Sequence, residues 1–152
     1  TMQLARNIFL YHSKTVSRKL EEFLLAWLIE NHFAISKERI LEIYLNIIEL
    51  GENIYGISEA SHYYFDKKVK DLNITEYLVL SYVIPRPKYF LEAVINKSPK
   101  LIKNLTAHIK FYSKVLLDKK LIDEKEYNEI DYNIIFKPSI GSLELIFNDQ
   151  ES

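Results

Sequence analysis

Apolar residues recur at helical spacing through most of the chain. In its first part, five of them share one predicted helix face: Leu20, Phe23, Leu24, Trp27 and Leu28. This pattern predicts an amphipathic helix that Thr15 or Ser17 caps and that reaches about His32. A shorter helix is predicted before it, over residues 2–11. The chain is therefore expected to begin with two helices in succession.

The middle of the chain carries the same helical signal, interrupted by turn residues. Ser36 precedes the run KERILEIYLNIIEL, which predicts a third helix that Gly51 ends. The next segment, ENIYG, is typical of a turn. Residues 57–65 then predict a fourth helix, in which the aromatic residues of HYYF are expected to pack in the core.

Capping residues mark a fifth helix. Asn73 and Glu76 form a capping-box pattern in front of the apolar run YLVLSYVI. Pro85 and Pro87 are expected to end this helix and to force an extended segment after it.

Two further helices follow in the last third of the chain. Ser98 and Pro99 predict the start of a long helix that reaches Lys119. Asp123 and Glu126 then predict the cap of one more short helix. From about residue 133 the pattern is lost, although SLELIF is compatible with a strand.

The composition agrees with an all-α domain. Only 3 Gly and 4 Pro occur in 152 residues, and 48% of the residues are hydrophobic, enough to build a core. We expect residues 1–133 to form one helical domain, residues 134–152 to form a tail, and no sheet of more than two or three strands.

Charge and cysteine content exclude several functions. The 20 Lys and Arg residues nearly balance the 21 Asp and Glu residues, which argues against non-specific nucleic-acid binding as the main task. The absence of Cys excludes disulfides, thiolate metal sites and a cysteine nucleophile. The sequence contains no run of 18 apolar residues, so no membrane span is predicted within it.

One group of charged residues could carry chemistry. Lys14, Arg18 and Glu22 are spaced four apart and would share a helix face, with Lys19 beside them. Arg6 and Gln3 are expected on one face of the preceding helix. Two such helices in contact would offer several donors to a phosphate. A solvated face with weak ion pairs explains the same spacing.

Four sequence strings, in order, resemble one known family. They are TMQLARN at residues 1–7, SRKLEE at 17–22, KERILEIYLN at 37–46, and IIELGENIYGISEASHYYFDK after it. They are similar to the family strings GGSTITMQLARN, RKxxE, KxxILExYLN and YGxxAAxxYFGK of the peptidoglycan glycosyltransferases. These occur as monofunctional transglycosylases and as the front domain of bifunctional penicillin-binding proteins, and the resemblance covers about residues 1–130.

The resemblance implies a lysozyme-like helical domain that is incomplete at its N-terminus. It also implies an enzyme of cell-wall biogenesis that polymerises lipid-linked disaccharide (lipid II) into glycan strands and releases undecaprenyl diphosphate. The implied location is the outward-facing surface of the bacterial cytoplasmic membrane, with an anchor outside this segment. Lipid II, the growing glycan strand and other cell-wall synthesis proteins are the implied partners, and no nucleic acid is expected.

The resemblance also implies roles for individual residues. The diphosphate would be contacted by four cations with one polar neighbour: Arg6, Lys14, Arg18, Lys19 and Gln3. Glu22 matches the second essential Glu of the family, which orients substrate, these cations or a bound divalent metal such as Mg. Tyr44 and Asn46 would line the cleft, with packing within their helix as the equally open alternative.

The sequence departs from the family pattern in several places. The first family motif, EDxxFxxHxG, carries the proposed general base and would lie upstream of Thr1. Residues 1–152 alone are therefore expected to be inactive. Lys14 stands where Arg is usual, Glu21 where many members have Lys, and Asp66 where the family usually has a Gly, which we expect to affect only a turn.

Two other functions fit the same sequence. A lysozyme-like hydrolase would cut glycan rather than build it. A non-catalytic relative would bind lipid or proteins without performing transfer.

Overall fold

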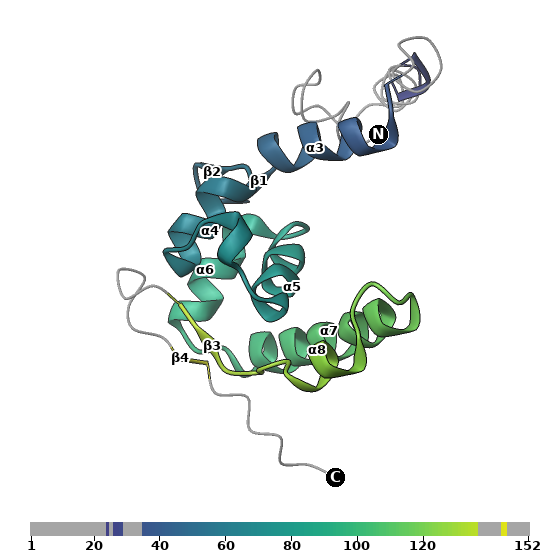
Figure 1. Cartoon of the computed structure of the whole chain (residues 1–152). Helices are drawn as coiled ribbons and strands as arrows, with labels where there is room; N and C mark the ends of the chain where they lie inside the picture. Colours follow the sequence, from purple (N-terminus) through teal and green to yellow (C-terminus); the bar gives the residue numbers. More distant parts are fainter. Residues whose placement is uncertain (1–23, 25, 29–34, 137–143, 146–152) are drawn as a thin grey trace. The chain divides into compact units, whose positions relative to one another are not determined.

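A computed structural model describes residues 24, 26–28, 35–136 and 144–145 (Figure 1). The chain divides into two compact units, Thr1–Ile48 and Glu49–Ser152. In both units the described residues are mostly helical.

The first unit contains one helix that is described in full, α3, over Lys37–Ile47. The hydroxyl of Ser36 accepts a hydrogen bond from the Arg39 backbone N–H at 3.2 Å, which confirms the predicted start. The described residues of the preceding helical segment, 24 and 26–28, are also helical, as predicted. Of the apolar stripe expected there, Leu24 and Trp27 are more than half exposed.

The predicted end of α3 at Gly51 is wrong. The helix ends at Ile47, and the next residues form a hairpin of β1 (Glu49–Gly51) and β2 (Ile54–Tyr55). The turn between these strands contains Asn53 in the left-handed region, with φ of 60°, which confirms the first part of the turn predicted at ENIYG, while Ile54 and Tyr55 of that segment form β2. The apolar run that suggested a continuing helix instead buries Leu50 in the hairpin.

Helix α4 covers Ile57–Phe65, as predicted. Its last turn is closed by Asp66, which adopts a left-handed conformation with φ of 56° and whose N–H donates to the His62 carbonyl. This conformation costs an ordinary residue about 1–2 kcal/mol and costs Gly little. The position where the family that the sequence resembles usually has Gly is therefore a helix-ending turn, as expected.

Helix α5 (Ile74–Val83) begins with the predicted capping box. The Asn73 side chain accepts from the Glu76 N–H at 2.8 Å, and the Glu76 carboxylate accepts from the Asn73 N–H at 2.9 Å. The same carboxylate accepts from the Lys67 amino group at 2.7 Å. Glu76 is 8% exposed, so these bonds tie Lys67, which lies between α4 and the short 3-10 helix η1 (Val69–Asp71), to the start of α5 through one buried carboxylate.

The extended segment predicted at Pro85–Pro87 is also wrong. Ile84 and Pro85 form a turn, Arg86 follows with φ of −146° and ψ of 55°, and Pro87 begins helix α6 (Pro87–Ile95). Proline suits this first position because its missing N–H would have no partner inside the helix and its φ already fits. Helix α5 does end before Pro85, at Val83, as predicted, and Pro87 also starts the next helix, which was not predicted.

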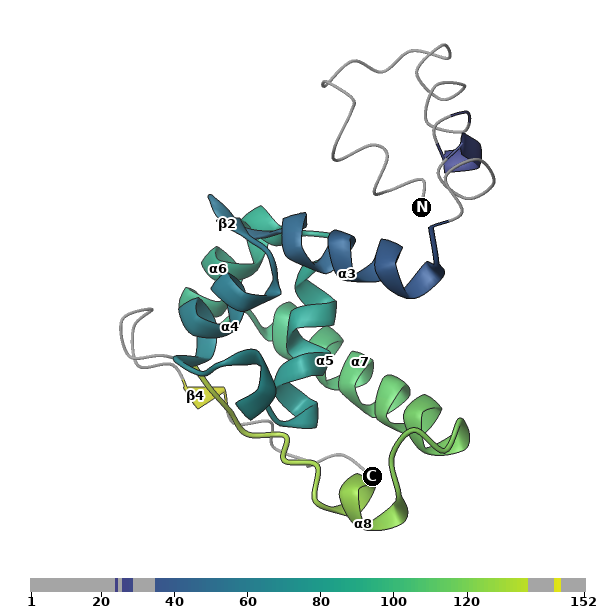
Figure 2. The ribbon, with the colours of Figure 1, turned by 45° about the horizontal axis from the view of Figure 1, so that its top comes forward.

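The remaining helices agree with the sequence. Helix α7 covers Pro99–Asp118, followed by the cap residue Lys119, and helix α8 covers Glu124–Asn128 with the predicted capping box. Within residues 49–136, α5 and α7 lie side by side, and the hairpin packs on α4 and α6 (Figure 2).

The segment after α8 returns along this unit. The Thr75 hydroxyl donates to the Asp131 carbonyl at 2.7 Å, and the Lys110 amino group lies 5.6 Å from the centre of the Tyr132 ring. Strand β3 (Ile134–Ile135) pairs antiparallel with β4 (Glu144–Leu145). Two residues of the segment SLELIF, which was compatible with a strand, thus form one. Ile134 and Phe136, in the first part of the expected tail, are buried and so pack in the core of this unit. Both sheets among the described residues have two strands, as predicted.

The core of the second unit is an aromatic cluster around Tyr64. Its ring is fully buried and contacts Phe90 and Phe136 edge-on, while Phe65 stacks on Phe136 with ring centres 5.7 Å apart. The Tyr64 hydroxyl donates to the Leu50 carbonyl at 2.8 Å, so this buried polar group is satisfied. Burial raises the pKa of Tyr64, which therefore stays a neutral donor.

Gly51 is the point where the hairpin meets this cluster. A Cβ atom at Gly51 would lie 2.6 Å from Ile54 Cδ1 and 2.9 Å from the Tyr64 hydroxyl oxygen. Both side chains are buried, and the hydroxyl is held by its bond to Leu50.

We expect Gly51→Ala to lower the free energy of unfolding by about 1–3 kcal/mol, the usual cost of overpacking a core. Urea denaturation measures this change. Ser58→Ala, on the exposed side of α4, is the control and should change stability by about 0.5 kcal/mol or less. Equal stability of the Gly51 and Ser58 variants would show that the hairpin can shift away from Tyr64 without cost.

Candidate functional site

The charged group predicted from the sequence lies outside the described residues. This holds for each of its members: Gln3, Arg6, Lys14, Arg18, Lys19 and Glu22. Their grouping around a phosphate and the roles assigned to them therefore stay predictions. The helix predicted over residues 2–11 lies outside the described residues as well.

The other two predicted site residues lie on α3. Asn46 is exposed, and its side-chain amide donates to the Glu42 carbonyl of the same helix at 2.7 Å. Tyr44 is half-buried, and this burial raises the pKa of its phenol. Arg39 and Glu42 form an exposed ion pair at 2.6 Å on the same helix. A role of Tyr44 and Asn46 in lining a cleft stays a prediction.

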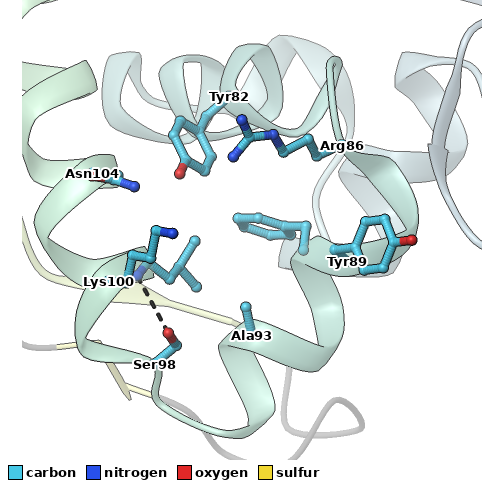
Figure 3. A pocket seen from close by; sticks show the side chains of 9 residues that line it. Tyr82, Arg86, Tyr89, Ala93, Ser98, Lys100 and Asn104 are labelled. Atoms are coloured by element: carbon cyan, nitrogen blue, oxygen red, sulfur yellow. Dashed lines mark hydrogen bonds between the residues drawn. The ribbon is translucent and has the colours of Figure 1, made fainter.

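The second unit contains a pocket of about 200 Å³ that the sequence did not reveal (Figure 3). It lies where the end of α5, the start of α6 and the start of α7 meet. Its lining residues are Tyr82, Arg86, Tyr89, Phe90, Ala93, Ser98, Lys100, Leu101 and Asn104. We refer to it as the Arg86–Lys100 pocket.

The local chain geometry explains how these side chains come together. Arg86 lies between α5 and α6, held between two prolines. Phe90, one turn into α6, is 3% exposed and forms part of the apolar wall with Leu101. The Ser98 hydroxyl caps α7 through a long hydrogen bond of 3.5 Å from the Leu101 N–H, which places Lys100 in the first turn.

The polar side chains of the pocket are mostly donors. Arg86 and Lys100 carry positive charge, Asn104 carries an amide, and no carboxylate is among the lining residues. Figure 3 shows the Arg86 guanidinium, the Asn104 amide and the Lys100 amino group around the pocket. Within the described part of the chain, neither cation is within ion-pair distance of an Asp or Glu. Such an arrangement is suited to an oxygen-rich, negatively charged group.

A histidine lies behind one wall of this pocket. The His108 ring contacts Tyr82 edge-on, with ring centres 5.2 Å apart, and its Nε2 lies 2.9 Å from the Ser81 hydroxyl. That hydroxyl also lies 2.7 Å from the Leu78 carbonyl, to which it donates within α5.

The described residues offer no evident metal centre. Residues 24, 26–28, 35–136 and 144–145 hold no group of three His, Asp or Glu residues that could bind an ion. Among these same residues, no helix has the length and apolar character needed to cross a membrane.

A signal for the pocket was present in the sequence. Lys100 follows the Ser98–Pro99 helix start, where the helix dipole favours acidic residues, and the first turn of α7 contains none. A lysine at this exposed position is disfavoured by about 0.3–1 kcal/mol at low ionic strength, and a nearby anion would offset that cost. The sequence did not indicate that Arg86 lies near Lys100, because the helix starting at Pro87 was not predicted.

Comparison with known proteins gives a consistent set of matches. A family model described as Transglycosylase matches residues 1–109. The biosynthetic peptidoglycan transglycosylase of Acinetobacter baylyi is 36% identical over 115 residues, which are 76% of this chain and 50% of that protein. Penicillin-binding protein 1F of Bacillus subtilis is 47% identical over 90 residues, 59% of this chain and 12% of that protein.

A solved structure shows the same fold. The crystal structure of penicillin-binding protein 1A from Haemophilus influenzae matches with a TM-score of 0.52 and 24% identity, over 88% of this chain and 19% of that one. The chain thus spans half the length or less of these relatives.

The histidine behind the pocket gives a pH-dependent prediction. Burial lowers the pKa of His108 below its ordinary value of 6.5. Between the folded and unfolded pKa values the unfolded chain binds more protons, so stability falls as pH drops below about 6.5. We expect His108→Gln to reduce the loss of unfolding free energy between about pH 7.5 and pH 5, measured by urea denaturation.

The matched control for this measurement is His62→Gln. His62 is exposed and lies 3.3 Å from Asp66, so its removal should leave the slope contributed by His108 in place. An unchanged pH slope in the His108 variant would show that this histidine is protonated equally in both states.

Proposed function

This chain belongs to the transglycosylase family, and on that premise we propose that the full-length protein polymerises lipid-linked disaccharide into glycan strands. The observation that carries the proposal is the family match over residues 1–109, which includes the RKxxE segment at Arg18–Glu22. The helical fold shared with a penicillin-binding protein supports the family assignment and says nothing of substrate.

The proposed reaction is a displacement at the anomeric carbon of the donor. The 4-hydroxyl oxygen of the acceptor sugar forms the new glycosidic bond, while the bond to the donor's diphosphate oxygen breaks and undecaprenyl diphosphate leaves. A general base takes the hydroxyl proton. The resemblance assigns this base to a Glu upstream of Thr1, so residues 1–152 supply the leaving-group side of the reaction.

Stabilising the leaving diphosphate requires positive charge at the right place. Charge that develops on an oxygen during bond breaking is best stabilised by donors already fixed around it. The proposed donors are cations of the first two predicted helices and of the segment between them, with Gln3 as a polar contact: Arg6, Lys14, Arg18 and Lys19. Arg18 is the strongest of these candidates, because a guanidinium can bind two diphosphate oxygens at once.

Glu22 is proposed to position these cations. It lies one helical turn after Arg18, at a spacing at which the two side chains can pair. A carboxylate held there would keep the guanidinium aimed at the diphosphate. A divalent ion such as Mg²⁺ would add counter-charge at the same place, and Glu22 is the candidate residue to contact it. The proposed displacement does not depend on that ion.

The proposed setting follows from the substrate. A lipid-linked disaccharide resides in the membrane, so the enzyme is proposed to act at the outer surface of the bacterial cytoplasmic membrane. Its proposed partners there are the growing glycan strand and other proteins of cell-wall synthesis.

The role of Glu22 gives the sharpest test. Glu22→Gln keeps the shape of the side chain and removes its charge. If Glu22 only forms an exposed ion pair, the change should cost a few tenths of a kcal/mol. If it positions the reacting groups, the barrier should rise by a few kcal/mol, which is about a hundredfold or more in rate. We expect the second result from polymerisation rates of the full-length protein.

Glu21→Gln is the matched control for this experiment. Glu21 is adjacent to Glu22 and would point about 100° away around the helix, so its variant should remain active. A thermal melt of both variants should lie near that of the unmodified protein. Near-normal turnover of Glu22→Gln would show that the charge of Glu22 is not needed for the reaction and would contradict the proposed role.

The cation cluster gives a second test. Arg18→Ala should weaken donor binding and lower turnover by about tenfold or more, because a charge-assisted hydrogen bond contributes about 1.5–3 kcal/mol. Lys103→Ala is the control, since Lys103 is exposed on α7 and does not line the Arg86–Lys100 pocket. Steady-state kinetics should show a loss for Arg18 alone. Equal losses would identify the cluster as ordinary surface charge.

A further inference from the structure

We propose that the Arg86–Lys100 pocket binds an organic anion, a phosphate or carboxylate group carried next to a ring or a short apolar segment. This goes beyond the proposed transfer reaction, because the pocket lies in the second unit and uses none of the residues from Gln3 to Glu22.

The lining of the pocket carries unbalanced positive charge. Two of the nine lining residues are cations and none is acidic, in a chain whose formal net charge is −1. Two like charges at one small pocket repel each other, and because both side chains are exposed, water screens part of that repulsion. Within the described residues no carboxylate pairs with either cation. A bound anion would supply the missing negative charge.

Lys100 occupies a position that adds to this charge. It lies in the first turn of a helix of 20 residues, where the partial positive charge of the helix end already repels a cation. The Lys100 backbone N–H also precedes the first intrahelical bond, which runs from Ile102 to the Ser98 carbonyl at 3.0 Å. Helix end and side chain thus direct positive charge to the same pocket, in addition to the Arg86 guanidinium.

The apolar walls of the pocket indicate what the rest of the ligand is. Phe90 and Leu101 are buried and supply an apolar wall, while Tyr82 and Tyr89 add ring faces to the lining. A cavity of about 150 Å³ is known to hold benzene, so this pocket of about 200 Å³ has room for one ring and a small anionic group. A free inorganic ion would leave these apolar walls in contact with water.

The pocket is also held in place by the core. Phe90 packs edge-on against Tyr64, with ring centres 5.7 Å apart, and against Tyr82 at 6.2 Å. Since Tyr64 is fully buried, the wall that would contact a ligand ring is fixed before any ligand arrives. Preformed walls reduce the entropy lost on binding and favour a defined ligand size.

The experiment is an NMR titration of the full chain with single-ring probes. Phenyl phosphate and benzoate carry an anion and a ring, benzamide carries the ring alone, and inorganic phosphate carries the anion alone. We expect both ring anions to bind with a Kd on the order of 1 mM, with shifts at the amides of Arg86–Phe90 and Ser98–Asn104. Benzamide and inorganic phosphate should each bind about tenfold or more weakly. The ratio of phenyl phosphate to benzoate binding separates a phosphate site from a carboxylate site.

Charge-removing variants test the assignment to these two residues. Arg86→Gln combined with Lys100→Gln should weaken phenyl phosphate binding about tenfold or more and leave benzamide binding unchanged. Lys103→Gln combined with Lys114→Gln removes two exposed charges from α7 outside the pocket and should change neither. A thermal melt confirms that both double variants are folded.

A shape-changing variant completes the test. Ala93→Leu fills the pocket without altering charge and should weaken the ring anions and benzamide together. The proposal is overturned if phenyl phosphate shifts no amides of the pocket, if the control double variant loses binding equally, or if Ala93→Leu has no effect. None of these results bears on glycan polymerisation, which is measured on a different substrate and with different variants.

Discussion

The hydrogen bond from the buried Tyr64 hydroxyl to the Leu50 carbonyl is the contact on which the second unit depends most. It is 2.8 Å long and joins the β1–β2 hairpin to α4 inside the core. The same ring packs against Phe90 of α6 and against Phe136 in the segment after α8. A single residue therefore connects parts of the chain that are far apart in sequence.

The packing around Tyr64 also holds the walls of the Arg86–Lys100 pocket in place. Because Phe90 is fixed against Tyr64, the first turns of α6 hold the chain that leads back to Arg86. On the other side, α7 is packed along α5, which sets the position of Lys100. The cations thus stand on elements anchored by the core. This is the arrangement expected where a binding site and a stable core share the same helices.

Local sequence signals predicted the elements that depend on local physics. The capping boxes at Asn73 and Asp123 and the cap at Ser98 mark helix starts that the structure confirms, because a side chain there satisfies an N–H close by in sequence. The start of α6 was missed although its signal is local, because a proline at the first position of a helix resembles a helix breaker. The predicted end of α3, in contrast, was wrong because of a contact between distant residues. Leu50 leaves the helical pattern to reach Tyr64, 14 residues away, and no periodicity records such a contact.

The candidate site residues likewise divide into those that the sequence indicated and those that only the packing of the helices reveals. The Arg18–Glu22 segment was found through sequence resemblance, and its geometry lies outside the described residues. The Arg86–Lys100 pocket was missed, because its two cations are separated by a helix that Pro87 starts rather than prevents. Each cation alone is an ordinary surface residue in the sequence. Only the packing of α5, α6 and α7 brings them to one place.

The central functional claim is that the protein builds glycan from lipid-linked disaccharide rather than cutting it. The most direct measurement is product analysis of the full-length protein with two substrates, lipid-linked disaccharide and finished glycan. The account predicts long glycan strands and released undecaprenyl diphosphate from the first substrate, and no shortening of the second. Cleavage of finished glycan without polymerisation of the lipid-linked substrate would contradict it.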